Sequence, residues 1–466
     1  MAAMSKPRTI GELRASGYQP KTVKQELRDN LIARLRQGTA LFPGIVGYEE
    51  SVLPQIENAI LSGQDIVFLG ERGQAKTRMA RLLTELLDAE MPAMAGCEIN
   101  DNPFAPICQA CRQAVAEHGD KAEIAWIARE RRYGEKLATP DITIADLIGE
   151  VDPIKVAEGR YLADELTIHY GLVPRTNRGI FAINELPDLA ERIQVGLLNI
   201  MEERDVQIRG YKVRLPIDVY VVASANPEDY TNRGRIITPL KDRFGSQIRT
   251  HYPRKLEDEI AIMEAELTQF PAAGFSYAPA PYMKQIVAEL THLARKSPEI
   301  SQRSGVSVRV SICNWENLLS NALKRAIRLD EREVAPRVSD LGALVSSTSG
   351  KIEMETLGDG GEDKVLGKLV QKAVLNVFNR SFTGGELDAV VAAFQGGFGV
   401  DVADSMPSPE YVRQIAEMRA LQPALKKLGA GDPASTAAAL EFVLEGLHLS
   451  RKLNKDSRAG RYRYRS

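Results

Sequence analysis

The sequence predicts an α/β fold in which a parallel sheet is flanked by helices, followed by an α-helical lid and a helical C-terminal region. Apolar strands alternate with helical segments between about residues 65 and 250, and the strand signals end after residue 255. The clearest strands are IVFLG, GIFAINE and DVYVVASAN. They are apolar enough to be buried on both faces, which is typical of a parallel sheet covered by helices.

The composition is that of an ordinary globular chain, and its 466 residues are enough for two or three domains. Its 60 basic and 62 acidic residues nearly balance, so the charge gives no case for binding nucleic acid or membranes. No apolar run approaches the roughly 20 residues that span a bilayer. The first 21 residues lack the apolar core of a signal peptide. With four cysteines in all, we expect a cytoplasmic protein.

Changes in composition divide the chain into four expected parts. They are a helical arm (1–40), an α/β core with an insertion at about 92–140 (41–254), a helical lid (255–345), and a linker plus helical C-terminal region (346–466). The glycine-rich run 346–364 is the expected linker. The segment 126–136 is interpreted as a solvated helix face, and the basic tail 451–466 as solvated and disordered.

A phosphate-binding loop is predicted after the first strand, in the stretch VFLGERGQAKTRMARLL. Such a loop aims backbone N–H groups at phosphates, and its lysine and threonine serve the β/γ-phosphates and Mg²⁺. The candidate nucleotide-binding residues here are Gly70, Glu71, Arg72, Gly73, Gln74, Ala75, Lys76 and Thr77. Ala75 stands where glycine is expected, which alanine tolerates if the position is already helical. The alternative is a glycine-containing turn before an ordinary helix.

Polar residues at the ends of the other strands favour a working nucleotide site. Asn184 and Glu185 end the second strand and Asn226 ends the third, at the edge where open α/β sheets bind ligands. A carboxylate there can polarise a water for attack on the γ-phosphate, and Asn226 can orient that water. Arg243, just beyond the sheet, can stabilise the charge that develops in a neighbouring subunit's nucleotide. The alternatives are a turn asparagine and a surface salt-bridge arginine.

These motifs together resemble the AAA+ ATPases, and within them the magnesium chelatase I-subunit and MoxR group. FPGIVGYEE is similar to the box that precedes the first strand. Residues 145–189 resemble the chelatase stretch that ends in the Walker B strand, and 194–230 resemble the following helix, hairpin and sensor-1 strand. The segment PLKDRFG is similar to the end of the AAA+ core. The resemblance covers about residues 40–330.

The resemblance implies a homo-oligomeric, usually hexameric ring that binds ATP and Mg²⁺ at its subunit interfaces. It assigns Lys76 and Thr77 to Walker A, Glu185 to Walker B, Asn226 to sensor 1 and Arg243 to the arginine finger. In the lid, Arg309 is the candidate sensor-2 residue. Arg233 and Arg235 compete with Arg243 for the finger.

One departure from the family pattern affects the expected turnover. Family members carry Asp-Glu at the end of the Walker B strand, and this chain carries Asn184-Glu185. An asparagine brings no negative charge to the Mg²⁺ shell. We therefore expect nucleotide binding to persist and hydrolysis to be slow.

Three cysteines in the expected insertion form a candidate metal site. Cys108 and Cys111 have the spacing to bind one ion, and Cys97 with His118 can complete a tetrahedral structural Zn²⁺ site. An iron–sulfur cluster would more naturally take four cysteines, and the remaining one is the remote Cys313. The alternative is a set of free thiols in a flexible insertion.

The expected function is that of a chelatase/MoxR-like AAA+ ATPase that couples ATP to remodelling, or to metal-cofactor maturation, of a partner protein. By resemblance that partner often contains a von Willebrand factor A domain. Two alternatives stay open: a nucleotide-gated scaffold with little turnover, and a DNA-associated AAA+ protein suggested only by the basic tail. The run FTGG at 382–385 is similar to a sigma-factor-engaging loop of one AAA+ class, but it lies beyond the lid and is interpreted as chance.

Overall fold

The chain consists of two compact units in this computed structural model, Met1–His251 and Tyr252–Ser466. The structure describes residues 6–151, 165–207, 214–226, 234–268, 272–302, 304–355, 361–458 and 460–466. Among these, no helix combines the length and apolar character needed to cross a membrane.

Five parallel strands form the central sheet of the first unit, in the order β11-β1-β10-β7-β4. They are β1 (Ile66–Leu69), β4 (Tyr133–Leu137), β7 (Gly179–Asn184), β10 (Val219–Ala225) and β11 (Ser246–Arg249). Leu69 pairs with Ala225 and Ile183 with Ala223. The carboxyl ends of β1, β10 and β7 therefore meet at one edge of the sheet.

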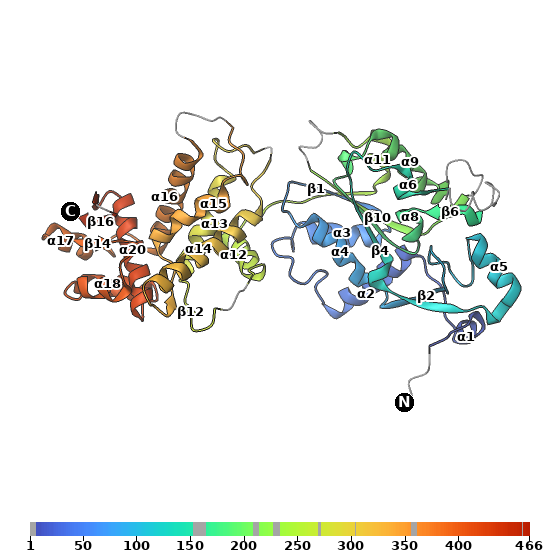
Figure 1. Ribbon diagram of the computed structural model, residues 1–466, viewed down its shortest axis with the longest axis horizontal. Helices are drawn as coiled ribbons and strands as arrows, with labels where there is room; N and C mark the ends of the chain where they lie inside the picture. The colour runs from blue at the N-terminus through green and yellow to red at the C-terminus, as the bar shows by residue number, and fades with distance from the viewer. Residues whose placement is uncertain are drawn as a thin grey trace. The chain divides into compact units, whose positions relative to one another are not determined.

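Helices cover both faces of this sheet (Figure 1). Because side chains alternate along a strand, Ile66 and Phe68 face one apolar cluster while Val67 faces the other. The first cluster includes α2 (Val23–Gln37), α3 (Val52–Leu61) and α4 (Lys76–Leu82). The second includes α6 (Ile144–Leu147), α8 (Leu172–Arg175), α9 (Glu191–Glu202) and α11 (Thr238–Arg243). The predicted parallel sheet flanked by helices is confirmed.

Short antiparallel pairs of strands also belong to the first unit. They are β2 (Glu90–Met94) with β3 (Ile124–Ala128), β5 (Gly149–Val151) with β6 (Ile168–Tyr170), and β8 (Asp205–Gln207) with β9 (Arg214–Pro216). Helices α1 (Ile10–Ala15) and α5 (Gln109–His118) belong to the same unit.

The interpretation of 126–136 as a solvated helix face is wrong. This segment contributes to β3 and β4, and Arg132 between them is 1% exposed. Arg132 donates two hydrogen bonds, of 2.7 and 2.6 Å, to the two carboxylate oxygens of Glu26 on α2. A charged side chain is buried only when it is paired in this way. The partner lies 106 positions away, so the local pattern could not show it.

Helix α2, which lies in the segment expected to be a helical arm, is part of the core of the first unit. Val23, Leu27 and Leu31 are each at most 1% exposed in the cluster that covers the sheet. The Glu26–Arg132 pair adds a buried bidentate contact between this helix and the segment before β4.

The second unit is mainly helical. Its helices are α12 (Leu256–Ala265), α13 (Pro281–Ala294), α14 (Val308–Arg328), α15 (Leu344–Thr348), α16 (Gly361–Ser381), α17 (Asp388–Gln395), α18 (Ser408–Gln414), α19 (Gln422–Lys427) and α20 (Pro433–Leu449). A short parallel pair joins β12 (Ser276–Tyr277) to β13 (Glu333–Val334). One apolar cluster runs from Met263 to Tyr464. The segments expected as a lid and as a separate C-terminal region thus share a core.

The basic tail is folded, which corrects the expectation that it is disordered. It forms the hairpin β15 (Asn454–Arg458) and β16 (Arg461–Arg465), and β16 also pairs with β14 (Val400–Val402). Tyr464 is buried, and its hydroxyl donates a hydrogen bond to Glu445 on α20. The alternation along β16 turns this tyrosine inward, so the tail closes the core of the second unit.

We predict that Glu26→Gln destabilises the first unit by about 3 kcal/mol, because it leaves the Arg132 guanidinium buried without an anion. Urea unfolding of the full chain measures this change. Asp29→Asn on the same helix is the matched control, since Asp29 pairs with Lys21 at an exposed site and should cost less than about 1 kcal/mol. Equal, small effects of both substitutions would contradict the assignment of α2 to the core.

Candidate functional site

The candidate nucleotide site lies where β1, β10 and β7 end. The phosphate-loop residues 70–75 follow β1 and lead into α4, Asn226 directly follows β10, and Glu185 directly follows β7. The parallel register brings these ends to one level, at the edge where α/β sheets bind ligands.

The phosphate loop is fixed by contacts with neighbouring elements. Gly70 leaves no room for a side chain, since a Cβ there would lie 2.0 Å from the Thr250 hydroxyl. That hydroxyl donates to the Gln74 side-chain oxygen at 2.6 Å. The Tyr48 hydroxyl donates to the Gln74 carbonyl at 3.0 Å. The loop conformation is therefore held by residues on both sides of it.

Ala75 adopts a left-handed backbone, with φ 57° and ψ 15°. Alanine would be unstrained if this position were helical, and the structure shows that it is not. A left-handed conformation costs a non-glycine residue about 1–2 kcal/mol. The position therefore has the geometry that glycine prefers, and the chain keeps it with an alanine.

Lys76 connects the loop to the end of β10. The residue is 7% exposed, and its ammonium donates to the Gly70 carbonyl, to the Glu71 carbonyl at 2.8 Å and to Asn226 Oδ1 at 2.5 Å. All three partners are hydrogen-bond-accepting oxygens, and the anionic oxygens of a phosphate can accept the same hydrogen bonds more strongly.

Asn226 in turn connects Lys76 to Glu185. Its side-chain amide donates to Glu185 Oε2, and the residue is 3% exposed. Glu185 has a left-handed backbone, with φ 56° and ψ 47°, a conformation that concentrates at functional sites in proteins. The structure thus brings the predicted Walker A lysine, sensor-1 asparagine and Walker B glutamate into one hydrogen-bonded series.

A second series of polar contacts runs from Thr77 through Asn184 to Glu135. The Thr77 hydroxyl donates to Asn184 Oδ1 at 3.2 Å, and Asn184 Nδ2 donates to Glu135 Oε1 at 2.7 Å. Glu135 also pairs with Arg81 at 2.7 Å. Burial opposes ionisation of Glu135, but hydrogen bonds and charge from Arg81 hold the pKa of this carboxyl below its usual range. Hydroxyl, amide and carboxylate oxygens are the ligand types that suit Mg²⁺.

Glu135 is a site residue that the sequence analysis missed. It lies on β4, in the segment interpreted as a helix face, and β4 pairs with β7 so that Leu137 is opposite Asn184. The alternation of side chains along YGEKL was the available signal. Only the strand order reveals that this carboxylate is next to Asn184.

The two arginine-finger candidates that the structure describes lie beside glutamates of α9. Arg243 forms an ion pair with Glu202 at 2.7 Å, which raises the pKa of its guanidinium. Arg235 is exposed, 3.9 Å from Glu191, and Arg233 lies outside the described residues. Arg309 belongs to the second unit, exposed in the first turn of α14.

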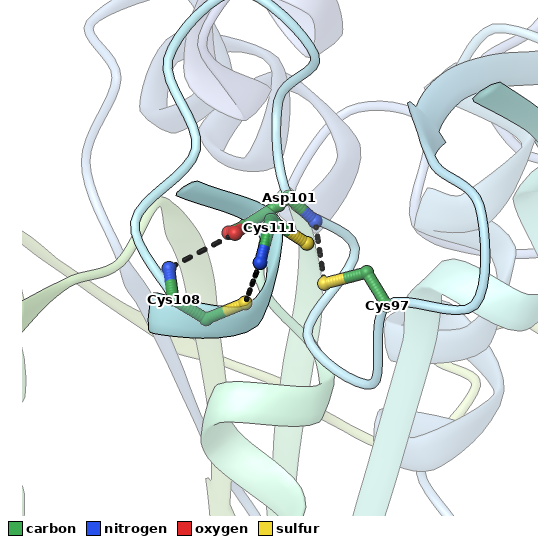
Figure 2. A group of neighbouring side chains, drawn as sticks. All are labelled: Cys97, Asp101, Cys108 and Cys111. Carbon is green, nitrogen blue, oxygen red and sulfur yellow. Dashed lines mark hydrogen bonds between the residues drawn. The ribbon is translucent and has the colours of Figure 1, made fainter. Parts of the chain in front are cut away.

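The three cysteines of the insertion meet in the structure, with Asp101 rather than His118 beside them. Ligand atoms of Cys97, Asp101, Cys108 and Cys111 all lie within 4.8 Å of one another (Figure 2). His118 is exposed at the end of α5, 3.9 Å from Glu117. Hydrogen bonds from the two other thiols hold the pKa of Cys97 below its usual range, against the effect of burial.

Comparison with known families gives one match inside the first unit. The model of the Sigma-54 interaction domain matches residues 158–243. This span contains Asn184, Glu185, Asn226 and Arg243. It starts after the phosphate loop and after the three cysteines of the insertion.

Two curated proteins are similar over part of the chain. The sigma-54-dependent transcriptional activator SfnR of Pseudomonas putida is 30% identical over an alignment of 116 residues that covers 21% of this chain and 32% of SfnR. AcoR, the acetoin dehydrogenase operon transcriptional activator of Bacillus subtilis (strain 168), is 26% identical over 97 residues, which are 21% of this chain and 16% of AcoR. The chain spans less than a third of either relative.

Among solved structures, the complex of the magnesium chelatase subunits BchI and BchD is 18% identical to this chain. The match covers 77% of this chain and 96% of that one, with a TM-score of 0.32. Together these matches do not single out the chelatase/MoxR group that the sequence motifs resemble.

We predict that Ala75→Gly raises the free energy of unfolding by about 0.5–1 kcal/mol. The substitution relieves about 1–2 kcal/mol of left-handed strain, and the greater freedom of glycine in the unfolded chain offsets about 0.4–1 kcal/mol of that. Urea unfolding is the measurement. Ala80→Gly, in the regular part of α4, is the control and should destabilise by at least about 1 kcal/mol. If both substitutions lower the free energy of unfolding by similar amounts, Ala75 is not strained.

Proposed function

We propose that this chain is an AAA+ ATPase that binds ATP and Mg²⁺ at the phosphate loop and hydrolyses the nucleotide with Glu185. The observation that carries the proposal is the hydrogen-bonded series Lys76–Asn226–Glu185. It connects a phosphate-binding cation, an amide that can orient a water, and a carboxylate that can accept its proton. The Sigma-54 interaction domain match, which spans two of these three residues, supports it.

In the proposed binding mode, the backbone N–H groups of residues 70–77 and the Lys76 ammonium receive the phosphates. The contacts of Gly70 and Gln74 with Thr250 hold the loop in place before any ligand arrives. A loop ordered in advance loses little entropy on binding. The left-handed Ala75 does not open the loop, so we expect nucleotide affinity to survive the missing glycine.

Mg²⁺, when bound, would be held at Thr77 and Asn184 and would neutralise phosphate charge. Asn184 lacks the negative charge of an aspartate, but the Glu135 carboxylate lies one hydrogen bond behind it. We infer that Glu135 supplies this charge from the neighbouring strand. An aspartate at 184 would instead place two carboxylates side by side, which disfavours ionisation of both.

We further propose that the chain works as a homo-oligomeric, hexameric ring, with Arg243 offered to the next subunit's nucleotide. The Glu202–Arg243 ion pair keeps this arginine on the surface beside α9. Arg309 remains the proposed sensor-2 residue of the second unit. Coupling ATP to a partner with a von Willebrand factor A domain, or to metal-cofactor maturation, rests on the resemblance of the motifs to the chelatase/MoxR group.

A second candidate function is the activation of sigma-54-dependent transcription. The match of residues 158–243 favours it, as do the two relatives, which are transcriptional activators. The two candidates differ in the partner that engages the ring. Phosphate release is measured once with sigma-54 RNA polymerase and once with a von Willebrand factor A-domain protein. The partner that stimulates turnover decides between the two functions.

The direct test of the ATPase is steady-state phosphate release with ATP and Mg²⁺. We expect Glu185→Gln to lower turnover by about 100-fold or more while ATP affinity stays the same, because it removes the general base and leaves Lys76 in place. Glu130→Gln, an exposed glutamate of the same unit, should be silent.

Two outcomes would change the proposal. Undiminished turnover in Glu185→Gln would remove Glu185 from the reaction. Tight ATP binding without turnover in any variant, with or without a partner, would favour the nucleotide-gated scaffold.

The inferred role of Glu135 is tested by exchanging charges between two positions. Glu135→Gln should raise the Mg²⁺ concentration needed for half-maximal turnover by about 10-fold, the usual size of an outer-shell effect on a metal site. The double variant Asn184→Asp, Glu135→Gln should return this Mg²⁺ concentration to within about threefold of the original value. The negative charge then lies on residue 184 itself, one hydrogen bond closer to the ion. A sharp gain of turnover in Asn184→Asp alone would mean that Glu135 supplies nothing.

A further inference from the structure

The side-chain cluster of Cys97, Asp101, Cys108 and Cys111 takes no part in the proposed nucleotide chemistry. Two segments build it: the loop after β2 contributes the first two residues, and the start of α5 contributes the other two. Figure 2 shows the four side chains converging from these segments. Cys108 and Cys111 are each 5% exposed, and Asp101 is completely buried.

The spacing of the ligand atoms fits a single ion. Three sulfurs and a carboxylate oxygen lie within 4.8 Å of one another. Tetrahedral Zn²⁺ with bonds of about 2.3 Å to sulfur requires ligand atoms roughly 3.8 Å apart. A cubane iron–sulfur cluster binds one protein ligand at each of its irons, so its ligands stand farther apart than those of one ion.

Asp101 has one paired and one unpaired carboxylate oxygen within the described part of the chain. One carboxylate oxygen, Oδ2, accepts hydrogen bonds from the backbone N–H groups of Ile107 at 3.1 Å and Cys108 at 2.9 Å. The other, Oδ1, is buried and has no hydrogen-bond partner among the residues that the structure describes. A buried carboxylate with an unsatisfied oxygen is costly unless a cation is bound to it.

The backbone around the cluster is arranged to support thiolates. Cys108 caps α5, and its sulfur accepts a hydrogen bond from the Cys111 N–H at 3.4 Å. The Cys97 sulfur accepts one from the Asp101 N–H, also at 3.4 Å. Such N–H donors, together with the two that hold Oδ2, are the outer contacts that orient the ligands of a metal site.

We propose that Cys97, Asp101, Cys108 and Cys111 bind one structural Zn²⁺ ion, with Asp101 as the fourth ligand. Three thiolates select a soft or borderline metal over Mg²⁺ or Ca²⁺. Four protein ligands leave no open position, so the ion stabilises the fold and does not carry out chemistry. His118, the fourth ligand expected from the sequence, is not used.

The site would stabilise the start of β7, at the opposite end of this strand from Glu185. Asn177 donates to the Ile99 carbonyl at 3.0 Å, and Arg178 donates to the Pro92 carbonyl at 2.8 Å. Both donors precede β7 directly, and both acceptors belong to β2 or to the loop that carries Cys97 and Asp101. Zn²⁺ bound in this loop would therefore fix the segment that anchors β7.

The experiment measures zinc bound to the purified full chain after exposure to Zn²⁺ and removal of excess metal. We expect one Zn²⁺ per chain in the unchanged protein and in the controls His118→Ala and Cys313→Ser, and below about 0.1 per chain in Cys108→Ser. Asp101→Asn should weaken zinc binding at least 10-fold in competition with a chelator. Cobalt in place of zinc should give the thiolate charge-transfer absorption of a tetrahedral site.

The proposal is overturned if the unchanged chain binds no zinc, or if His118→Ala loses it while Asp101→Asn keeps it. Should Cys108→Ser fail to fold, chelation of the unchanged protein replaces it. The thermal midpoint should then fall and be restored by Zn²⁺ but not by Mg²⁺, and a midpoint indifferent to the chelator counts against the site. None of these readouts depends on ATP turnover, so they are independent of the proposed ATPase.

Discussion

The buried carboxylate of Asp65 sets the geometry on which the first unit depends. Asp65 lies one residue before β1 and is 4% exposed. It accepts hydrogen bonds from the Val221 N–H at 2.9 Å and from Arg204 at 2.5 Å, and it forms an ion pair with Lys24 of α2 at 3.1 Å. The contact with Val221 fixes β1 against β10 at their amino ends. Because rise per residue is uniform along paired strands, the same register places Gly70 and Asn226 side by side at the other end.

Much of the fold follows from patterns within single segments. The strands β1, β7 and β10 are predictable because burial on both faces makes them apolar throughout. The segment of β3 and β4 is not, since Arg132 is neutralised by a glutamate from a distant helix. The tail is not predictable from its sequence for a similar reason. Its arginines suggest solvent, whereas Leu453 and Tyr464 are buried and Tyr464 donates a hydrogen bond to Glu445. Long-range pairing decides these cases, and it leaves no periodic signal.

In the candidate site too, residues with a signal in their own segment were predictable, and residues whose role depends on long-range contacts were not. Lys76, Asn226 and Glu185 were predicted from loop and strand-end signals, and the structure brings them into contact. Glu135 was not, since its relevance arises only from the pairing of β4 with β7. Asp101 was missed because a carboxylate among cysteines has no characteristic spacing. Glu135 explains why asparagine fits at position 184: the Asn184 side-chain amide donates a hydrogen bond to the Glu135 carboxylate.

The position of β16 has a consequence for biosynthesis. This strand is the middle one of its sheet, with β14 on one side and β15 on the other, and it brings Tyr464 into the core of the second unit. During translation that core is not complete until β16 has left the ribosome, because Tyr464 belongs to it. The first unit has by then been complete for a time on the order of tens of seconds. Vectorial synthesis therefore separates the folding of the two units in time.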